Sequence, residues 1–328
     1  MGDPAGVGPE IIVKAWNALR LTGPAFVVVG DFHALAAASS AGASILRRVG
    51  APEEATPAFA AALPVLDTPM ATTVVSGQPL GAHAHHVIRW IEIGAGLALS
   101  GAVSGLVTAP IAKGPLYEAG FAFPGHTEFL AELTSATPYS GRRGPVMMLA
   151  APGLRTALVT IHEPIARVAS ALTMEAVVRT GEVTAECLTS CFGVEAPRLA
   201  VAGLNPHAGE GGALGWEEAE IIAPACEQLR RSGIEVSGPR PADTLFHPEA
   251  RATYDAAVCM YHDQALIPVK MLDFWGGVNV TLGLPIVRTS PDHGVGYDIA
   301  GRGVARPDSL IAAIRMAGDI AARRSRAA

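Results

Sequence analysis

The segment RLAVAGLNPHAGEGG, residues 198–212, joins a short apolar run to a loop rich in glycine and polar side chains. An uninterrupted apolar run of this length is typical of a strand that is buried on both faces of a parallel sheet. Helical patterns flank it, at residues 165–192 on one side and at residues 216–233 on the other. The order helix, strand, helix predicts an α/β fold with a largely parallel sheet.

The same alternation runs through the rest of the chain. Helices are expected at residues 8–20, 85–99, 126–134 and 308–324, and strands at residues 26–31, 104–110, 256–262 and 278–290. Residues 146–162 carry two strand patterns around Pro152-Gly153, whereas the Pro- and Ala-rich residues 52–70 are predicted to form a loop. We therefore expect two interleaved α/β lobes with a cleft between them, which together form one catalytic unit over residues 1–328.

The composition limits the possible classes of protein. Apolar residues make up 50% of the 328 residues and charged residues 16%, so the chain can bury a large core and is not a disordered protein. The 24 Lys and Arg against 30 Asp and Glu give a formal net charge of −6, which argues against a general nucleic-acid-binding protein. A small anionic substrate is compatible with this charge, because one or two local cations suffice to bind it.

The sequence predicts a cytoplasmic protein without a membrane partner. The N-terminal MGDPAGVGPE lacks the features of a signal peptide, and the longest apolar stretch, residues 93–110, predicts a helix and a strand rather than a membrane span. The four cysteines are few and irregularly spaced, at positions 187, 191, 226 and 259. We interpret them as reduced thiols that pack in the core.

Three histidines follow predicted strands. His162 ends the strand ALVTIH, His207 follows the strand of residues 198–202, and His262 ends the strand AAVCMYH. Ligands of open α/β sheets bind outside the carboxyl ends of the strands, and three imidazoles there could hold one divalent cation. The alternative is that each histidine is a polar cap of its own strand, and the spacing alone favours neither interpretation.

Further polar residues lie near these histidines in the sequence. Asp243 and Asp263 could act as general acid or base groups beside a metal, or could form an Asx-turn and a helix N-cap, respectively. Lys270, Asn279 and Arg288 could together clamp a phosphate or carboxylate, although each taken singly is a plausible surface residue.

Two other features are assigned no site. The cluster of His83, His85 and His86 predicts an exposed helix start rather than a chelating tract. The loop GDPAGVGPE, residues 2–10, is suited to anions because it leads into a helix N-terminus, but it matches no standard nucleotide-binding fingerprint.

Seven motifs, taken together, resemble the 4-hydroxythreonine-4-phosphate dehydrogenase family of pyridoxal 5′-phosphate biosynthesis. They are GDPAGVGPE, VTAPIAKGPL, FPGHTEFLAELT, GLNPHAGEGG, PADTLF, MYHDQALIPVK and VNVTLGLPIVRTSPDHG. The resemblance runs from residue 2 to about residue 320 and implies a fold related to isocitrate and isopropylmalate dehydrogenases. Members of that family carry a short apolar strand before the first motif. Met1 stands where that strand would end, so the resemblance predicts that a first strand is missing here.

The resemblance also implies roles for named residues. It implies one divalent metal ion per site (Zn, Mg, Co or Mn) held by His162, His207 and His262, in a homodimer where His262 comes from the partner subunit. It implies acid/base roles for Asp243 and Asp263. Substrate contacts carry over to His126, Thr127, Lys270, Asn279 and Arg288.

A second likeness concerns the cofactor. Residues 292–301, DHGVGYDIAG, are similar to the loop with which isocitrate-type dehydrogenases hold the adenine end of NAD or NADP. On this likeness, His293, Gly294 and Asp298 are expected to contact the cofactor.

The implied activity is NAD(P)-dependent, metal-dependent oxidation of 4-(phosphooxy)-threonine in pyridoxine 5′-phosphate biosynthesis. The product, 2-amino-3-oxo-4-(phosphooxy)butanoate, decarboxylates to 3-amino-2-oxopropyl phosphate. One alternative is a dehydrogenase of threonate or erythronate 4-phosphate, or of an aromatic cis-diol carboxylate, on the same scaffold. Another is a metal hydrolase or a non-catalytic metal-binding protein, which would form no NAD(P)H with any substrate.

Overall fold

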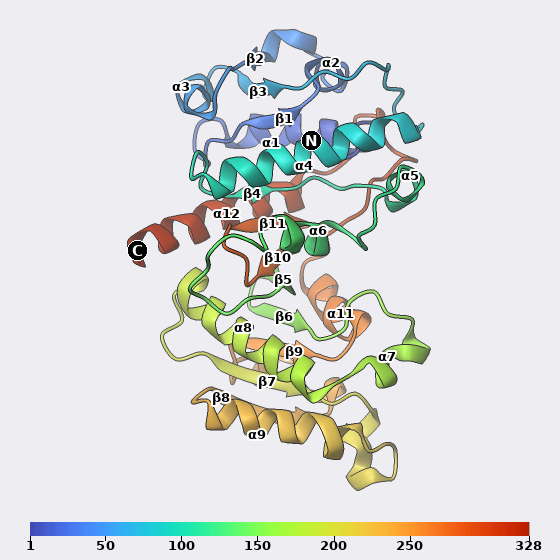
Figure 1. The fold of residues 1–328 in the computed structure, drawn as a ribbon, viewed down its shortest axis with the longest axis vertical. Coiled ribbons are helices and arrows are strands. Elements are labelled where there is room, and N and C mark those ends of the chain that lie inside the picture. The colour runs from blue at the N-terminus through green and yellow to red at the C-terminus, as the bar shows by residue number, and fades with distance from the viewer. Residues whose placement is uncertain (328) are drawn as a thin grey trace. The chain divides into compact units, whose positions relative to one another are not determined.

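The computed structural model describes residues 1–327 and divides the chain into two compact units (Figure 1). Unit 1 contains residues 1–137 and 286–319, and unit 2 contains residues 138–285 with the chain from Ile320 onward. Each unit thus takes residues from two separate parts of the chain, as expected for interleaved lobes. The predicted α/β class with two lobes is confirmed. No helix among residues 1–327 is both long and apolar enough to cross a lipid bilayer.

Unit 1 is built on a three-stranded parallel sheet with the order β1-β3-β2. Its strands are β1 (Val28–Gly30), β2 (Leu46–Arg48) and β3 (Leu63–Asp67). The core of this unit is formed mainly by α1 (Gly8–Leu19), which carries Pro9 in its first turn and buries Ile11, Trp16 and Leu19. Unit 1 also contains the parallel strands β4 (Leu106–Val107) and β11 (Arg288–Pro291).

The prediction of a loop over residues 52–70 is wrong. The segment contains the short helix α3 (Ala55–Ala58) and, in β3, the middle strand of the unit 1 sheet. Val65 of β3 is completely buried. Proline is depleted in strand interiors because it lacks an N–H group, so Pro64 hid a short apolar run that otherwise fits a buried strand.

Unit 2 is built on a sheet with the strand order β10-β5-β6-β9-β7-β8. Its strands are β5 (Val146–Ala151), β6 (Leu154–Leu158), β7 (Arg198–Ala202), β8 (Glu235–Arg240), β9 (Ala256–Cys259) and β10 (Val278–Leu282). β5 is antiparallel to both β6 and β10, whereas β6, β9, β7 and β8 are parallel. The carboxyl ends of β6, β9 and β7 therefore lie at one edge of the sheet.

Helices cover both faces of the unit 2 sheet (Figure 1). Leu199 and Val201 of β7 pack with α8 (Met174–Phe192) and α9 (Ala223–Arg231), whereas Ala200 and Ala202 pack on the side of α11 (His262–Leu272). This alternation explains why the strand has an uninterrupted apolar sequence. The long helical pattern predicted over residues 165–192 is divided into α7 (Ile165–Ala171) and α8, because Thr173 caps the start of α8.

The remaining helices connect these layers. They are α2 (Phe32–Ala37), α4 (Ala84–Leu99), α5 (Lys113–Glu118), α6 (His126–Leu133), α10 (Pro248–Arg251) and α12 (Asp308–Ala327). The four cysteines are buried free thiols, as predicted. The expectation of an exposed histidine cluster at the start of α4 is wrong for His83, which is only 2% exposed, whereas His85 is exposed.

Candidate active site

Two of the three strand-end histidines lie together in unit 2. His162 follows β6 and His262 follows the neighbouring parallel strand β9, and their ring centroids are 5.9 Å apart. The Nδ1 atom of His262 lies 2.7 Å from Oδ1 of Asp263. When Nδ1–H donates to that carboxylate, Nε2 keeps its lone pair for a metal ion, an arrangement common among metal-binding histidines. The donor set and its neighbouring carboxylate therefore fit a divalent metal.

His207 lies on a turn after β7, the strand on the other side of β9. This turn, Pro206–Gly212, is left-handed, with φ of 52° at His207 and 44° at Glu210. Within residues 1–327 no three His, Cys, Asp or Glu side chains are close enough to form a metal site. The chain therefore brings His162 and His262 together, but does not by itself assemble the expected set of three.

The two candidate acid/base carboxylates are both exposed in unit 2. Asp263 lies in the first turn of α11, which begins at His262, and the N-cap is Tyr261. The alternative interpretation of Asp263 as the N-cap is therefore wrong. Asp243 lies on a short 3-10 turn, Ala242–Thr244.

Unit 1 contains a buried cation. Arg288, the first residue of β11, is 3% exposed, and its Nη2 donates a hydrogen bond of 2.7 Å to Oγ1 of Thr108, just after β4. Burial lowers the pKa of the Arg288 guanidinium to about 10, against the opposing effect of the Glu128 carboxylate. The side chain therefore keeps its positive charge at neutral pH in an environment where water screens that charge poorly.

His126 and Thr127 begin α6 in the same unit. Burial, and then the charge of Arg288, hold the pKa of His126 well below its usual range. Its imidazole is therefore neutral at neutral pH and can donate one hydrogen bond to an anion. A neutral imidazole donor and the buried guanidinium of the same unit are the kind of groups that could bind an anion.

The other two predicted substrate residues belong to unit 2. Asn279 lies on β10, and its Oδ1 is buried without a hydrogen bond from any described residue. Lys270 lies on α11, with Nζ 5.2 Å from the centroid of the Phe274 ring. The five predicted substrate residues are thus divided, three in unit 1 and two in unit 2.

The predicted cofactor residues lie in an irregular segment of unit 1. His293, Gly294 and Asp298 are exposed, and Nδ1 of His293 is 3.0 Å from the carbonyl oxygen of Gly294. The segment is fixed to the N-terminal loop, since Val7 N–H donates to the carbonyl of Val295 at 2.8 Å.

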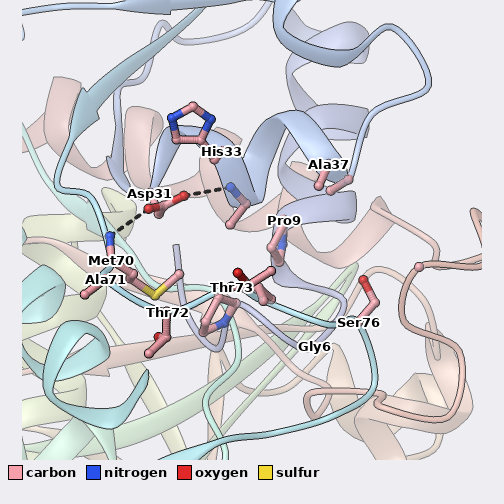
Figure 2. Close-up of a pocket in the computed structure, with 15 residues that line it drawn as sticks. Gly6, Pro9, Asp31, His33, Ala37, Met70, Ala71, Thr72, Thr73 and Ser76 are labelled. Atoms are coloured by element: carbon pink, nitrogen blue, oxygen red, sulfur yellow. Dashed lines mark hydrogen bonds between the residues drawn. The ribbon is translucent and has the colours of Figure 1, made fainter. Parts of the chain in front are cut away.

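A pocket of about 380 Å³ lies in unit 1 (Figure 2). Asp31, directly after β1, accepts hydrogen bonds of 2.7 Å from the backbone N–H groups of Ala34 and Met70 and so joins two sides of the pocket. The walls are mainly Pro and Ala side chains, and polar groups come from the segment after β3. The lining residues are Pro4, Gly6, Pro9, Asp31, His33, Ala34, Ala37, Ala38, Met70, Ala71, Thr72, Thr73, Val74, Ser76 and Gly301.

Neither Thr108 nor this pocket is predicted by the sequence. Thr108 lies at the end of a correctly predicted strand, but its contact with Arg288 joins residues 180 positions apart, for which a single sequence holds no signal. The pocket depends on β3, which the sequence analysis assigned to a loop.

These features fit an α/β enzyme for a small anionic substrate, with a pocket in unit 1 large enough for part of a nucleotide. Residues 23–317 match the family model of the pyridoxal phosphate biosynthetic protein PdxA. The chain belongs to this family.

Relatives of known name agree with this assignment. A 4-hydroxythreonine-4-phosphate dehydrogenase of Caulobacter vibrioides is 70% identical over 323 residues, which cover 98% of this chain and 96% of that protein. The crystal structure of 4-hydroxythreonine-4-phosphate dehydrogenase from Klebsiella pneumoniae matches with a TM-score of 0.84 and 40% identity, covering 98% of both chains. A terephthalate 1,2-cis-dihydrodiol dehydrogenase from Burkholderia xenovorans LB400 matches with a TM-score of 0.63 and 30% identity, covering 97% of this chain and 96% of that one.

Replacing Thr108 tests the anion site. Thr108→Val keeps the shape of the side chain but removes the acceptor of the Arg288 hydrogen bond, so binding of inorganic phosphate should weaken by about 1–2 kcal/mol, roughly 5- to 30-fold. Phosphate titration followed by 31P NMR measures this. Thr108→Ser should bind nearly as well as the unmodified protein. Thr184→Val is the matched control, because the buried Thr184 hydroxyl has no described partner. Unchanged phosphate binding by Thr108→Val would contradict the assignment.

Proposed function

We propose that this protein oxidises 4-(phosphooxy)-threonine with NAD+ or NADP+ to 2-amino-3-oxo-4-(phosphooxy)butanoate. That β-keto acid then loses CO2 to give 3-amino-2-oxopropyl phosphate. The observation that carries the proposal is the near full-length match to a relative of this name at 70% identity. It is supported by the buried cation Arg288 beside the neutral His126, which suits a phosphate group.

The chain's own residues would divide the work as follows. Arg288, His126 and Thr127 would bind the phosphate, with Thr108 holding the Arg288 guanidinium in place. Lys270 and Asn279 would bind the polar groups at the other end of the substrate. Exposed Asp263 or Asp243 would accept the proton of the hydroxyl group at C3.

Two bound groups supply the remaining chemistry. His162, His207 and His262 would hold the divalent ion, which acts as a Lewis acid that lowers the pKa of the substrate hydroxyl. A bound nicotinamide cofactor would supply the acceptor for the hydride that leaves C3. Asp263 would also orient His262 through the 2.7 Å contact with Nδ1.

A second candidate function is oxidation of an aromatic cis-diol carboxylate. It is favoured by the likeness to the terephthalate dihydrodiol dehydrogenase, which extends over 97% of this chain. That substrate class has carboxylates in place of a phosphate, and the buried Arg288 could bind either anion. The closer relatives favour the phosphorylated substrate.

A side-by-side assay tests the choice of substrate. NADH or NADPH formation should be fastest with 4-(phosphooxy)-threonine, slower with threonate 4-phosphate and absent with the cis-diol of terephthalate. Arg288→Ala should weaken binding of the phosphorylated substrate by about 1.5–3 kcal/mol, because it removes a charged hydrogen bond. This loss should appear as a higher KM. Faster turnover of the phosphate-free diol would contradict the proposal. A lack of NAD(P)H with every substrate would favour a hydrolase or a binding protein.

We further propose that the protein is a homodimer and that each metal site is shared between subunits. Exposed apolar side chains gather on and just after α11, the helix that begins with His262. They are Ile267, Met271, Leu272, Phe274 and Trp275, and Met271 is 81% exposed. A patch of this kind is typical of a protein–protein interface, and a second subunit covering it would approach His262. A third ligand from that subunit would complete the pair His162 and His262.

Co-expression of inactive variants tests the shared site. The three variants His162→Ala, His207→Ala and His262→Ala are combined two at a time, and each preparation is verified to contain mixed dimers. If two ligands come from one subunit and the third from its partner, two of the three pairs should regain up to one intact site per dimer. The pair that stays inactive identifies the two ligands from the same subunit. The contact within one chain favours His162 and His262, whereas the family resemblance implies His162 and His207.

The metal is first stripped with a chelator, the chelator is removed, and Zn2+, Co2+, Mn2+ or Mg2+ is added back. Enzyme activity is then measured. No recovery in any mixed dimer would contradict the shared site and leave a three-histidine site within one chain. Full activity in the metal-free protein would contradict the metal itself.

For the cofactor, we propose that the unit 1 pocket receives the adenosine part of NAD(P). Gly301 belongs both to the pocket lining and to the segment 292–301 that holds His293, Gly294 and Asp298. The apolar walls suit a flat base, and the exposed hydroxyls of Thr72 and Thr73 suit a ribose (Figure 2).

Filling the pocket tests this assignment. Ala37→Trp puts a large ring at the exposed wall residue Ala37, so KM for NAD+ should rise at least tenfold, about 1.4 kcal/mol. Phosphate binding and the melting temperature should change little. The control is Ala61→Trp, an exposed alanine of the same unit outside the pocket. An unchanged KM for NAD+ in Ala37→Trp, with normal turnover, would place the cofactor elsewhere.

A further inference from the structure

We propose that Glu218 is a positioning residue: its buried carboxylate holds the left-handed turn that presents His207 to the metal ion. The inference rests on the proposed metal role of His207. Glu218 itself is 4% exposed and lies behind the turn, so it acts through the turn.

The turn has an unfavourable backbone conformation. His207, Ala208, Gly209, Glu210 and Gly211 all have positive φ, between 44° and 81°. Three of the five carry side chains, and each of these costs about 1–2 kcal/mol in the left-handed region. Such a run persists only when surrounding contacts fix it, and strain of this kind gathers at functional sites.

Glu218 supplies the strongest of these contacts. Its Oε1 accepts from the backbone N–H of Asn205 at 2.7 Å, and its Oε2 accepts from Nδ2 of Asn205 at 2.9 Å. Nδ2 of Asn205 also donates to Oε2 of Glu217 at 2.7 Å. Both oxygens of Glu218 therefore hold Asn205, two residues before His207, in a fixed orientation.

The turn also closes directly over this carboxylate. A Cβ atom at Gly209 would lie 2.6 Å from Oε2 of Glu218, and one at Gly203 would lie 3.1 Å from Oε1. Gly209, at φ 81°, is thus the residue that lets the turn fold back onto the carboxylate. Glu218 contacts the turn on both sides of His207.

The support continues into the core of unit 2. Glu218 begins a π-turn, Glu218–Ile222, that leads into α9, and Ile222 is completely buried in the cluster with Leu199 and Val201 of β7. π-turns are rare and frequently occur at functional sites. The strand before the turn and the helix after it are thus packed together beneath the carboxylate.

Glu218 forms no ion pair with a lysine or arginine among residues 1–327, and its hydrogen bonds come from the amide groups of Asn205. A buried carboxylate without a cation is costly, whereas an uncharged residue could fill the same space. Only a carboxylate has two oxygens that accept from both Asn205 donors at once, which accounts for an acid at this position.

Metal affinity in the full-length protein tests the proposal. Glu218→Gln keeps the shape but sets an NH2 group against one of the two N–H donors of Asn205, so affinity for Co2+ or Zn2+ should fall by about 10- to 100-fold. The visible absorption of bound Co2+ should change as well. At saturating metal, kcat should recover while KM for NAD+ stays unchanged. Glu220→Gln, an exposed glutamate of the same π-turn, is the matched control and should behave as the unmodified protein.

Two further variants keep the test decisive. If Glu218→Gln does not fold, Asn205→Ala, which removes the Nδ2 donor from the half-buried Asn205, should give the same loss of metal affinity. His207→Ala reports on the metal assignment itself. Weaker metal binding in His207→Ala, with unchanged affinity and Co2+ spectrum in folded Glu218→Gln, overturns this proposal alone. Unchanged metal binding in His207→Ala overturns the metal role of His207 instead.

Discussion

Three parallel strands of unit 2, β6, β9 and β7, end at one edge of their sheet, and the candidate metal chemistry depends on that alignment. Because the strands are neighbours, the residues that follow them, His162, His262 and His207, leave the sheet at the same edge. The alignment is maintained by cores on both faces, where alternate residues of β7 pack against different helices. A strand that slipped by one residue would exchange its two buried faces and move its histidine. Stability and ligand placement therefore depend on the same register.

Buried charge is used differently in the two units. In unit 1 the cation Arg288 is held by the Thr108 hydroxyl, and its charge helps to keep His126 neutral. In unit 2 the carboxylate of Glu218 is held by amide groups and forms no ion pair within the described chain. Each charge is costly to bury, so each is retained by groups that also fix its direction. In unit 1, the buried cation suits an anionic substrate.

The α/β class and most strand positions could be predicted from apolar runs and their spacing, as β9 and the pair β5 and β6 illustrate. The position of β3 could not be predicted, because Pro64 interrupts its short apolar run. The candidate ligands were found because each histidine follows an apolar run, which is a local signal. Thr108 and Glu218 were not found from the sequence, because their roles depend on contacts that form only in the folded chain. The handedness of the turn at Pro206–Gly212 could not be predicted either, because nothing in the sequence PHAGEGG distinguishes a flexible loop from the left-handed turn that the structure shows.

The candidate metal ligands lie outside the buried clusters, so the core of unit 2 can fold without a metal ion. None of the three histidines belongs to the buried clusters of unit 2, which are formed by aliphatic side chains, methionines, cysteines and Tyr254. Those clusters can therefore form whether or not a metal is bound. A ligand that binds only the assembled protein stabilises that assembly by mass action. If the metal site is shared, this stabilisation acts on the dimer rather than on the single subunit. The strained turn at His207 fits this order of events, because Glu218 and the core beneath it fix the turn before the metal arrives.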